Sequence, residues 1–325
     1  PPLLAIAIAI VITFPLSYLS WRYVEQPFRS SKNVNVQRFT VSVGSTVSIF
    51  LVVGLLGHFT NGFYSFKKSL LDVDSAELVV DRDRIFEERR AYWSELLPDG
   101  GLAFDEDEKR KVLILGDSLS QDLFVSVSVT EELLTSNQFR RLALDDTCMS
   151  LASSIMDGSR FGQNITYTRD KCSRQIPAVL GSSNWIEADE IVLPANWQPD
   201  TNGYALEFAQ AAARKGKRVS ILGLAQFNDM ASLSFRMPSD YKTIPNFIYK
   251  NIREKYLDVT EDLQRKSESM DNVQYLDKLG LFCNKASQSC DIFDEEEKFV
   301  IYDSAHLTVS GAHEFGSRIV EAEWF

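Results

Sequence analysis

The stretch Lys111 to Asp122, KVLILGDSLSQD, constrains the fold of this chain more than any other. Its four consecutive apolar residues, Val112 to Leu115, are typical of a short strand that is buried on both faces of a sheet. Gly116 ends this run, and from Leu119 onward apolar residues recur at helical spacing. The pattern predicts a buried strand, a tight turn and a helix, with Ser118 at the carboxyl end of the strand and at the start of the helix.

Strand-like and helix-like patterns alternate from this point to the end of the chain. The strand patterns are 111–116, 140–145, 190–195, 218–223 and 272–277, and the helix patterns are 118–135, 202–215, 246–268 and 309–320. Such alternation predicts an α/β domain of three layers, α/β/α, around a roughly five-stranded parallel sheet. With a flavodoxin-like strand order, a ligand would bind where the order reverses, beside the ends of the first and third strands.

The turn after the first strand carries Asp117 and Ser118, where backbone N–H groups at a helix start favour negative charge. Asp and Ser also cap helices, so the pair alone fits a purely structural role equally well. A second motif favours chemistry: Asp303 and His306 stand three residues apart, just before the helix pattern 309–320. A serine nucleophile needs an imidazole to accept its proton, and the imidazole needs a carboxylate to hold its tautomer. The sequence therefore predicts Ser118 as nucleophile, His306 as general base and Asp303 as the orienting acid.

The G-D-S after a strand and the D-x-x-H before the last helix resemble the first and last blocks of the SGNH (GDSL-like) esterase and acyltransferase superfamily. The resemblance covers roughly residues 109–325. It implies an SGNH-hydrolase fold for this region and the same three catalytic residues, Ser118, His306 and Asp303.

The donors of an oxyanion hole are less directly marked in the sequence. Asn196 follows the third strand, where its side-chain amide could donate beside the backbone N–H of Ser118, although a turn role for Asn196 stays open. SGNH enzymes commonly carry this Asn in a G-x-N-D setting, and this chain has neither that Gly nor that Asp. The glycine of the family's second block is also missing from residues 145–150. The hole is therefore either reduced or built from backbone N–H groups near Cys148.

The four cysteines form two local sets, Cys148 with Cys172 and Cys283 with Cys290. The spacing C-x-x-C is absent and the chain has only three histidines, so we expect no metal site. Four unrelated buried thiols are one interpretation. Two local disulfides fit better, and they would place the domain in an oxidising compartment.

Two apolar runs, Pro1 to Leu19 and Val41 to Phe59, are each about long enough to cross a membrane as a helix. A signal peptide would carry a positive flank and a small-residue cleavage site, which the first run lacks. A buried helical hairpin is the alternative that needs no membrane. Between the runs, four Lys or Arg residues stand against one acid, so the positive-inside rule predicts a cytoplasmic loop and an external carboxyl-terminal part.

These patterns divide the chain into three parts. They are 1–59, with transmembrane helices at about 1–20 and 40–59; 60–109, a charged extracytoplasmic linker; and 110–325, the α/β domain. Within the linker, residues 75–97 have an amphipathic pattern, which we interpret as a solvated connecting helix.

Residues 17–29, SYLSWRYVEQPFR, resemble the end of a late transmembrane helix in the acyltransferase-3 family, which runs out as S-Y-x-x-x-E-x-P-F-R. The spacing between Tyr18 and Glu25 is longer here than in the common form. Members with a fused SGNH domain place one further span after this motif, followed by an extracytoplasmic SGNH domain. Since the sequence begins Pro-Pro, we expect a longer protein with an upstream transmembrane acyltransferase domain. The resemblance implies a bacterial inner membrane, a periplasmic SGNH domain and acetyl-CoA as the ultimate acyl donor, with no cofactor bound by this segment.

The expected function is transfer of an acetyl group to a hydroxyl of an extracytoplasmic glycan, such as lipopolysaccharide O-antigen or exopolysaccharide, through an acyl-serine at Ser118. A membrane-anchored esterase that uses water as acceptor would need the same residues. A non-catalytic scaffold is disfavoured because all three catalytic positions are intact. The formal net charge of −11 argues against nucleic acid as a partner.

Overall fold

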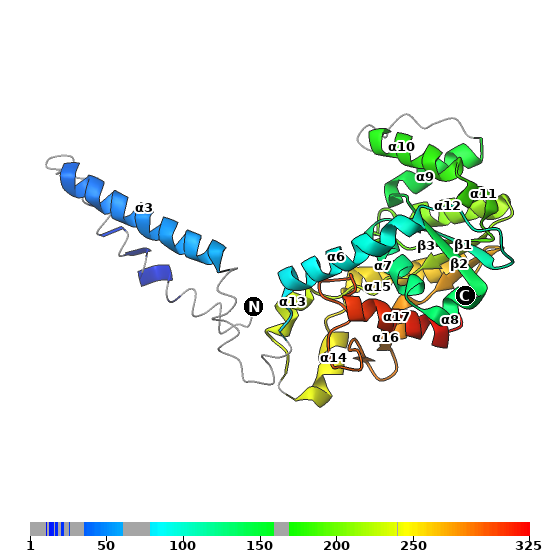
Figure 1. The fold of residues 1–325 in the computed structure, drawn as a ribbon. Coiled ribbons are helices and arrows are strands. Elements are labelled where there is room, and N and C mark those ends of the chain that lie inside the picture. The colour runs from blue at the N-terminus through cyan, green and yellow to red at the C-terminus, as the bar shows by residue number, and fades with distance from the viewer. Residues whose placement is uncertain are drawn as a thin grey trace. The chain divides into compact units, whose positions relative to one another are not determined.

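The computed structural model describes residues 11, 13–15, 17–18, 21–22, 26, 36–60, 79–158, 169–238 and 240–325. The chain divides into two compact units, Pro1–Leu70 and Leu71–Phe325. In the first unit, Val36–Phe59 forms the 24-residue helix α3 (Figure 1). Most of the first predicted span, and most of the acyltransferase-3-like motif, lie outside the described residues. None of the described helices, including α3 over the predicted span 40–59, combines the length and apolar character that a membrane span requires.

The second unit is built on one parallel five-stranded sheet, as the sequence predicted. Its strands are β1 (Arg110–Gly116), β2 (Asn137–Ala143), β3 (Glu190–Leu193), β4 (Arg218–Leu222) and β5 (Val273–Leu276). The order is β2-β1-β3-β4-β5, with every neighbouring pair parallel. This order confirms the predicted flavodoxin-like reversal between the first and third strands.

Helices cover both faces of the sheet. The longer ones are α6 (Arg82–Gly100), α7 (Ser118–Ser128), α9 (Asp146–Met156), α10 (Arg169–Leu180), α12 (Asn202–Arg214), α15 (Glu254–Ser267) and α17 (Val309–Glu321). Shorter segments are α8 (Glu131–Ser136), α11 (Ser183–Glu187), α13 (Met230–Ser234), η2 (Tyr241–Thr243), α14 (Ile244–Tyr249) and α16 (Lys278–Phe282), with a small hairpin of β6 (Cys283–Asn284) and β7 (Ser289–Cys290). The patterns 118–135 and 246–268, each predicted as one helix, are each broken in two, and α9 and α10 were not predicted.

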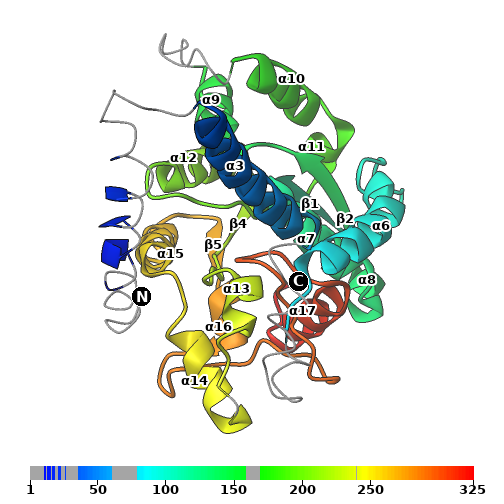
Figure 2. The same cartoon turned by 90° about the vertical axis from the view of Figure 1, so that its left-hand side faces the viewer.

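The alternation of side chains along the strands explains the three layers. In β1, Val112 and Ile114 pack into a core shared with α7 and α17, whereas Leu113 and Leu115 pack into a second core shared with α9, α12 and α15. All four side chains are fully buried, as expected of a central strand covered on both faces. Figure 2 shows α12 and α15 on one side of the sheet and α7 and α17 on the other.

Helix α6 corrects the predicted solvated connector. It belongs to the same compact unit as the sheet, and it packs against α7 with Trp93 only 2% exposed and Arg89 buried. Trp93 forms a small apolar cluster with Val125 of α7 and Ala312 of α17. The charged composition of this segment concealed the contact, because the partner of its buried arginine lies 33 residues further along the chain.

Both predicted disulfides are present. Cys148–Cys172 joins α9 to α10, and Cys283–Cys290 closes the β6–β7 hairpin. No cysteine is left free.

A close approach of backbone between β1 and the end of β3 shapes the turn that carries Ser118. A Cβ atom on Gly116 would lie 1.8 Å from the carbonyl oxygen of Pro194, so only glycine fits here. The contact brings the start of α7 beside the segment that contains Asn196.

Candidate active site

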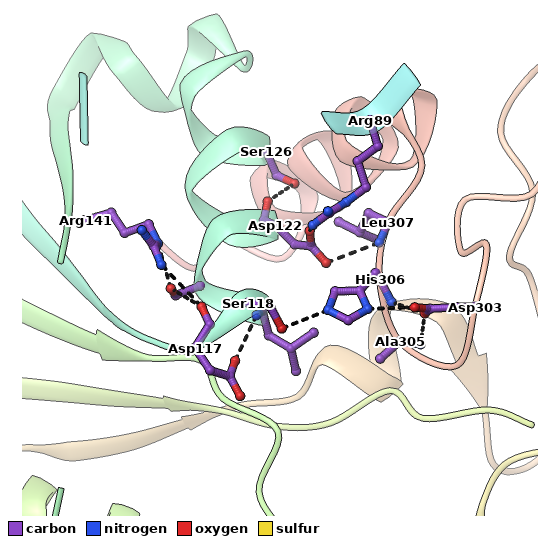
Figure 3. Close-up of polar contacts among 12 residues, drawn as sticks. Arg89, Asp117, Ser118, Asp122, Ser126, Arg141, Asp303, Ala305, His306 and Leu307 are labelled. Carbon is purple, nitrogen blue, oxygen red and sulfur yellow. Dashed lines mark hydrogen bonds and ion pairs between the residues drawn. The ribbon is translucent and has the colours of Figure 1, made fainter. Parts of the chain in front are cut away.

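The structure brings the three predicted catalytic residues together at the carboxyl end of the sheet (Figure 3). Ser118 is the first residue of α7, while Asp303 and His306 lie in the loop before α17. His306 Nε2 is 2.9 Å from Ser118 Oγ, and His306 Nδ1 is 2.8 Å from Asp303 Oδ2. These contacts form one continuous hydrogen-bonded chain from hydroxyl to carboxylate.

Asp303 is held as an ionised carboxylate. Its Oδ1 accepts the backbone N–H groups of Ala305 and His306, both at 2.8 Å. Burial would raise the pKa of Asp303, but the hydrogen bond and charge of His306, together with these amides, outweigh it and lower the pKa to about 2. An ionised carboxylate can only accept, so Nδ1 of His306 carries the proton and Nε2 is free to accept from Ser118.

The environment also makes His306 a stronger base. Burial lowers the pKa of His306, but the hydrogen bond to Asp303 and the negative charges of Asp122 and Asp303 outweigh it, so the pKa is raised. Arg89 opposes this rise. The imidazole can therefore take the hydroxyl proton of Ser118 more readily than an isolated histidine would.

The loop that carries Asp303 and His306 is fixed by the segment after β4. The backbone N–H of Phe227 donates to the carbonyl of Ser304 at 2.9 Å, and that of Met230 donates to the carbonyl of Asp303 at 3.1 Å. These bonds use loop carbonyls, so they hold the backbone while the side chains of Asp303 and His306 remain directed at Ser118.

Asp117, not Ser118, caps the helix. Its Oδ1 accepts the N–H of Leu119 and its Oδ2 accepts the N–H of Asn196, both at 2.8 Å, as expected of a residue that bonds turn amides. Burial raises the pKa of Asp117 in spite of these two bonds. The hydroxyl of Ser118 is left to contact His306, which separates the structural role of the Asp from the role we predict for the Ser.

The side chain of Asn196 is oriented by a residue that sequence reasoning missed. Gln226, which is 3% exposed, donates from Nε2 to Asn196 Oδ1 at 2.9 Å. This contact uses the carbonyl end of the amide and leaves Nδ2 as the group that could donate to a substrate. No spacing in the sequence links the two residues, which follow different strands.

Two backbone groups near Cys148 are already engaged. The N–H of Thr147 donates to Asp146 Oδ1 at 2.8 Å, and the N–H of Cys148 donates to the carbonyl of Asp145 at 2.9 Å. These bonds weaken the predicted alternative in which amides near Cys148 form the oxyanion hole, and favour the side chain of Asn196.

Charged groups beneath the triad were also missed. Asp122 is fully buried and pairs with Arg89, and Lys278 is 3% exposed with its Nζ 5.1 Å from the centre of the Phe315 ring. Burial lowers the pKa of Lys278, opposed by the charges of Asp122 and nearby aspartates. The one available signal was Asp122 itself, which stands on the apolar face of a predicted helix. Among the described residues, no group of three His, Cys, Asp or Glu side chains is arranged to hold a metal ion.

The domain has a parallel sheet between two layers of helices, with a hydrogen-bonded Ser-His-Asp chain at the carboxyl ends of the strands. Comparison with known families identifies the class of protein that has this arrangement. A family model described as the SGNH domain fused to AT3 domains matches residues 90–321. The chain belongs to this family. The AT3 part itself is not shown in this chain.

Solved structures share the fold at low sequence identity. The periplasmic domain of a lipopolysaccharide acetyltransferase from Salmonella ser. Paratyphi A aligns with a TM-score of 0.51 and 12% identity, covering 75% of this chain and 100% of that one. A structure from Streptococcus pneumonia described as a proposed platelet activating factor aligns with a TM-score of 0.37 and 12% identity, covering 74% of this chain and 94% of that one. No curated protein sequence matches the chain at a significant level.

Proposed function

We propose that this domain is an O-acyltransferase that moves an acetyl group onto a hydroxyl of an extracytoplasmic polysaccharide, through an acyl-serine at Ser118. The observation that carries the proposal is the continuous chain from Ser118 Oγ through His306 to Asp303, with contacts of 2.9 and 2.8 Å. Nucleophile, base and orienting acid within hydrogen-bond reach are what serine-based acyl transfer requires.

In the proposed reaction, Ser118 Oγ attacks the carbonyl carbon of the acyl donor while His306 Nε2 takes the hydroxyl proton. Asp303 stabilises the imidazolium that results. The oxyanion lies at the start of α7, where the N–H of Ser118 and the amide of Asn196 are the candidate donors. His306 then returns the proton to the leaving group. In the second half, the acceptor hydroxyl attacks the acyl-serine while His306 takes its proton. His306 then gives that proton to Ser118 Oγ as the bond between Oγ and the acyl carbon breaks, which regenerates both residues.

The glycan acceptor and the acetyl group are proposed from the resemblance of residues 17–29 to acyltransferase-3 proteins, and the matching family is described as an SGNH domain fused to AT3 domains. The structural neighbour from Salmonella is the periplasmic domain of a lipopolysaccharide acetyltransferase, and its fold likeness is consistent with that acceptor class. The two disulfides fit an oxidising, extracytoplasmic compartment. In this proposal an upstream AT3 domain supplies acetyl groups derived from acetyl-CoA.

A carbohydrate esterase is the second candidate. Ser118 is exposed, so water could reach an acyl-serine as readily as a sugar hydroxyl could. Both candidates share every step up to the acyl-enzyme, and they differ only in the acceptor that removes the acyl group.

The two candidates can be separated in one assay on the full chain. A fluorophosphonate probe should label wild type at Ser118, and p-nitrophenyl acetate should be turned over. Adding an oligosaccharide acceptor should then divert acetyl groups from free acetate to acetylated sugar. Labelling at another residue would overturn the proposal, and acetate as the sole product at saturating sugar would favour the esterase.

Membrane attachment through the amino-terminal part is proposed from the apolar runs and the Lys/Arg bias between them. Single cysteines placed at positions 32 and 70 should be labelled from opposite sides of the membrane in intact cells. Labelling of both from the same side would exclude the proposed topology.

A further inference from the structure

The buried carboxylate of Asp122 connects three elements of the fold. It lies on α7, one helical turn after Ser118, and is fully buried. Its Oδ1 is 2.5 Å from Nη2 of Arg89 on α6, and its Oδ2 accepts the N–H of Leu307 at 3.2 Å. Figure 3 shows Asp122 between Arg89 and the loop that carries His306.

Stability alone does not explain this arrangement. Asp122 stands between the buried apolar residues Leu119 and Leu123 of α7, where an apolar side chain would pack without loss of hydration. Arg89 is 8% exposed, and its guanidinium lies 4.6 Å from the centre of the Trp93 ring, so the cation is held in one place. A buried ion pair of this kind often contributes less to stability than apolar residues of similar volume.

The contact with Leu307 suggests what the pair does instead. Leu307 directly follows His306, and the same α7 helix carries Ser118 at its first residue. Because Asp122 holds the Leu307 backbone, the positions of nucleophile and base are both set relative to one helix. Arg89 in turn fixes the carboxylate from a third element, α6, and lies one residue before the part of the chain that the family model matches.

We propose that Asp122, held by Arg89, is the positioning residue that keeps His306 over Ser118. The inference rests on the proposed function, because it assigns a role to these residues in the same reaction. Neither residue touches the reacting atoms. Their effect is on the 2.9 Å contact between His306 Nε2 and Ser118 Oγ, and a displacement of about 1 Å at such a contact can lower a rate by about 100-fold.

The charges around His306 provide a readout that packing alone would not change. His306 is faced by Asp303 of its own loop, Asp122 of α7, Arg89 of α6 and Asp117 at the end of β1. Lys278 of α16 acts on the same aspartates. In Asp122→Asn, the amide oxygen can still accept the N–H of Leu307, but the negative charge that favours the imidazolium is lost. The pH at which kcat/KM rises should therefore move to a lower value.

The decisive variant removes both charges together. Arg89→Met/Asp122→Leu replaces the ion pair by apolar side chains, which can preserve folding, but deprives the Leu307 N–H of its acceptor. We expect a thermal midpoint near that of wild type and a fall of about 100-fold in kcat/KM for p-nitrophenyl acetate. Arg90→Met is the matched control and should behave as wild type. Arg90 is an exposed neighbour on the same helix, and within the described part of the chain it pairs with the exposed Glu87.

The outcomes separate this inference from the proposed function. Turnover that depends on Ser118 but survives in a folded double variant would overturn the inference alone. If the double variant does not fold, an Asp122→Asn profile that coincides with that of wild type would overturn it as well. Equal turnover by wild type and Ser118→Ala would overturn the proposed function, and this inference with it. A folded, slow double variant and a shifted Asp122→Asn profile would support the inference.

Discussion

Partly or fully buried carboxylates lie at both ends of the same sheet, and they have different surroundings. At the amino ends of the strands, Glu190 of β3 is 1% exposed and pairs with Arg110 of β1 and the hydroxyl of Ser220 on β4. At the carboxyl ends, Asp303 accepts two loop amides and His306, and the chain of contacts continues to the exposed Ser118. The first cluster joins neighbouring strands, whereas the second leads to a group that a substrate can reach.

This difference predicts a division of labour between the two ends. Changes at the carboxyl end should remove activity and leave folding largely intact, because the side chains there hold one another and a loop rather than the sheet. Changes at the amino end should do the reverse. Activity should fall most when Ser118 is replaced and least when the amino end of the sheet is changed.

Ser118→Ala should abolish acyl transfer and labelling by a fluorophosphonate. The nucleophile is lost outright, while an exposed residue at the start of α7 contributes little to packing. Turnover of p-nitrophenyl acetate and the thermal midpoint should be measured on the same preparation. Ser120→Ala offers a control two residues away, since Ser120 is buried and bonds Asp117 and Arg141 rather than His306. Loss of folding in Ser118→Ala would contradict the division.

Asp303→Asn should lower kcat by about four orders of magnitude if it behaves as the orienting acid of the serine-protease template does. The side chain keeps its shape, but its NH₂ group can meet His306 Nδ1 and force the proton onto Nε2, where it blocks acceptance from Ser118. The measurement is kcat at saturating ester. His306→Ala should lower kcat about as much as Ser118→Ala does. The variant that carries both changes should be no slower than either single variant, since the two residues act as one unit. An Asp303→Asn enzyme with near-normal kcat would show that the carboxylate does not set the tautomer.

Asn196→Ala should reduce kcat by about 100- to 1000-fold if the amide donates to the oxyanion. Gln226→Glu tests the same role through the residue that orients Asn196. A carboxylate cannot donate to Asn196 Oδ1, so the amide of Asn196 should rotate and turn its NH₂ group away from the oxyanion. The losses of kcat in the two single variants should not add in the double variant, since each change removes the same donor. If Asn196→Ala keeps wild-type kcat while Ser118→Ala is inactive, Asn196 is a turn residue only.

The dependence of activity and stability on pH should separate at the carboxyl end. His306 must be neutral to accept a proton, and its pKa is raised above the ordinary 6.5. The midpoint of the rise in kcat/KM should therefore lie above 6.5, with activity falling about tenfold per pH unit below it. A midpoint at or below 6.5 would contradict the electrostatic reading of the site.

The stabilising effects of the same two groups run in opposite directions. Asp303, with its pKa lowered from 3.8 to about 2, contributes stability that is complete above pH 3.8 and is lost as the pH falls towards 2. His306, with a raised pKa, contributes stability that is complete below 6.5 and is lost as the pH rises through its folded value. Near pH 5 the domain should therefore be folded but slow, which thermal melts and initial rates on one buffer series can check.

The sequence predicted the parts of this molecule that are encoded by neighbouring residues. The apolar run Val112 to Leu115, the turn after it and the D-x-x-H motif each signal their structure within a few positions, so the sheet order and the triad could be anticipated. The Arg89–Asp122 pair could not be anticipated, because the two residues are 33 positions apart in the sequence. The hydrogen bond between Asp122 and Leu307 joins residues that are 185 positions apart. From the sequence alone, a highly charged helix is interpreted as solvated, because the elements that pack against it are distant in the chain.

The smallest effect on activity is expected at the amino end of the sheet. Glu190→Gln keeps the volume and an acceptor for Ser220, but leaves Arg110 without its counter-charge in a setting where its side chain is 26% exposed. Removing one partner of a buried ion pair lowers the free energy of unfolding by about 3 to 5 kcal/mol. We expect a loss of about 3 kcal/mol here, because Arg110 is partly hydrated.

Glu187→Gln is the matched control, since Glu187 pairs with Lys111 near the same end of the sheet but is 39% exposed. Denaturant unfolding should show the loss in Glu190→Gln only, and kcat of the folded enzyme should be unchanged in both. A fall in kcat without a fall in stability would mean that the two ends of the sheet are coupled, and that the division drawn between them is wrong.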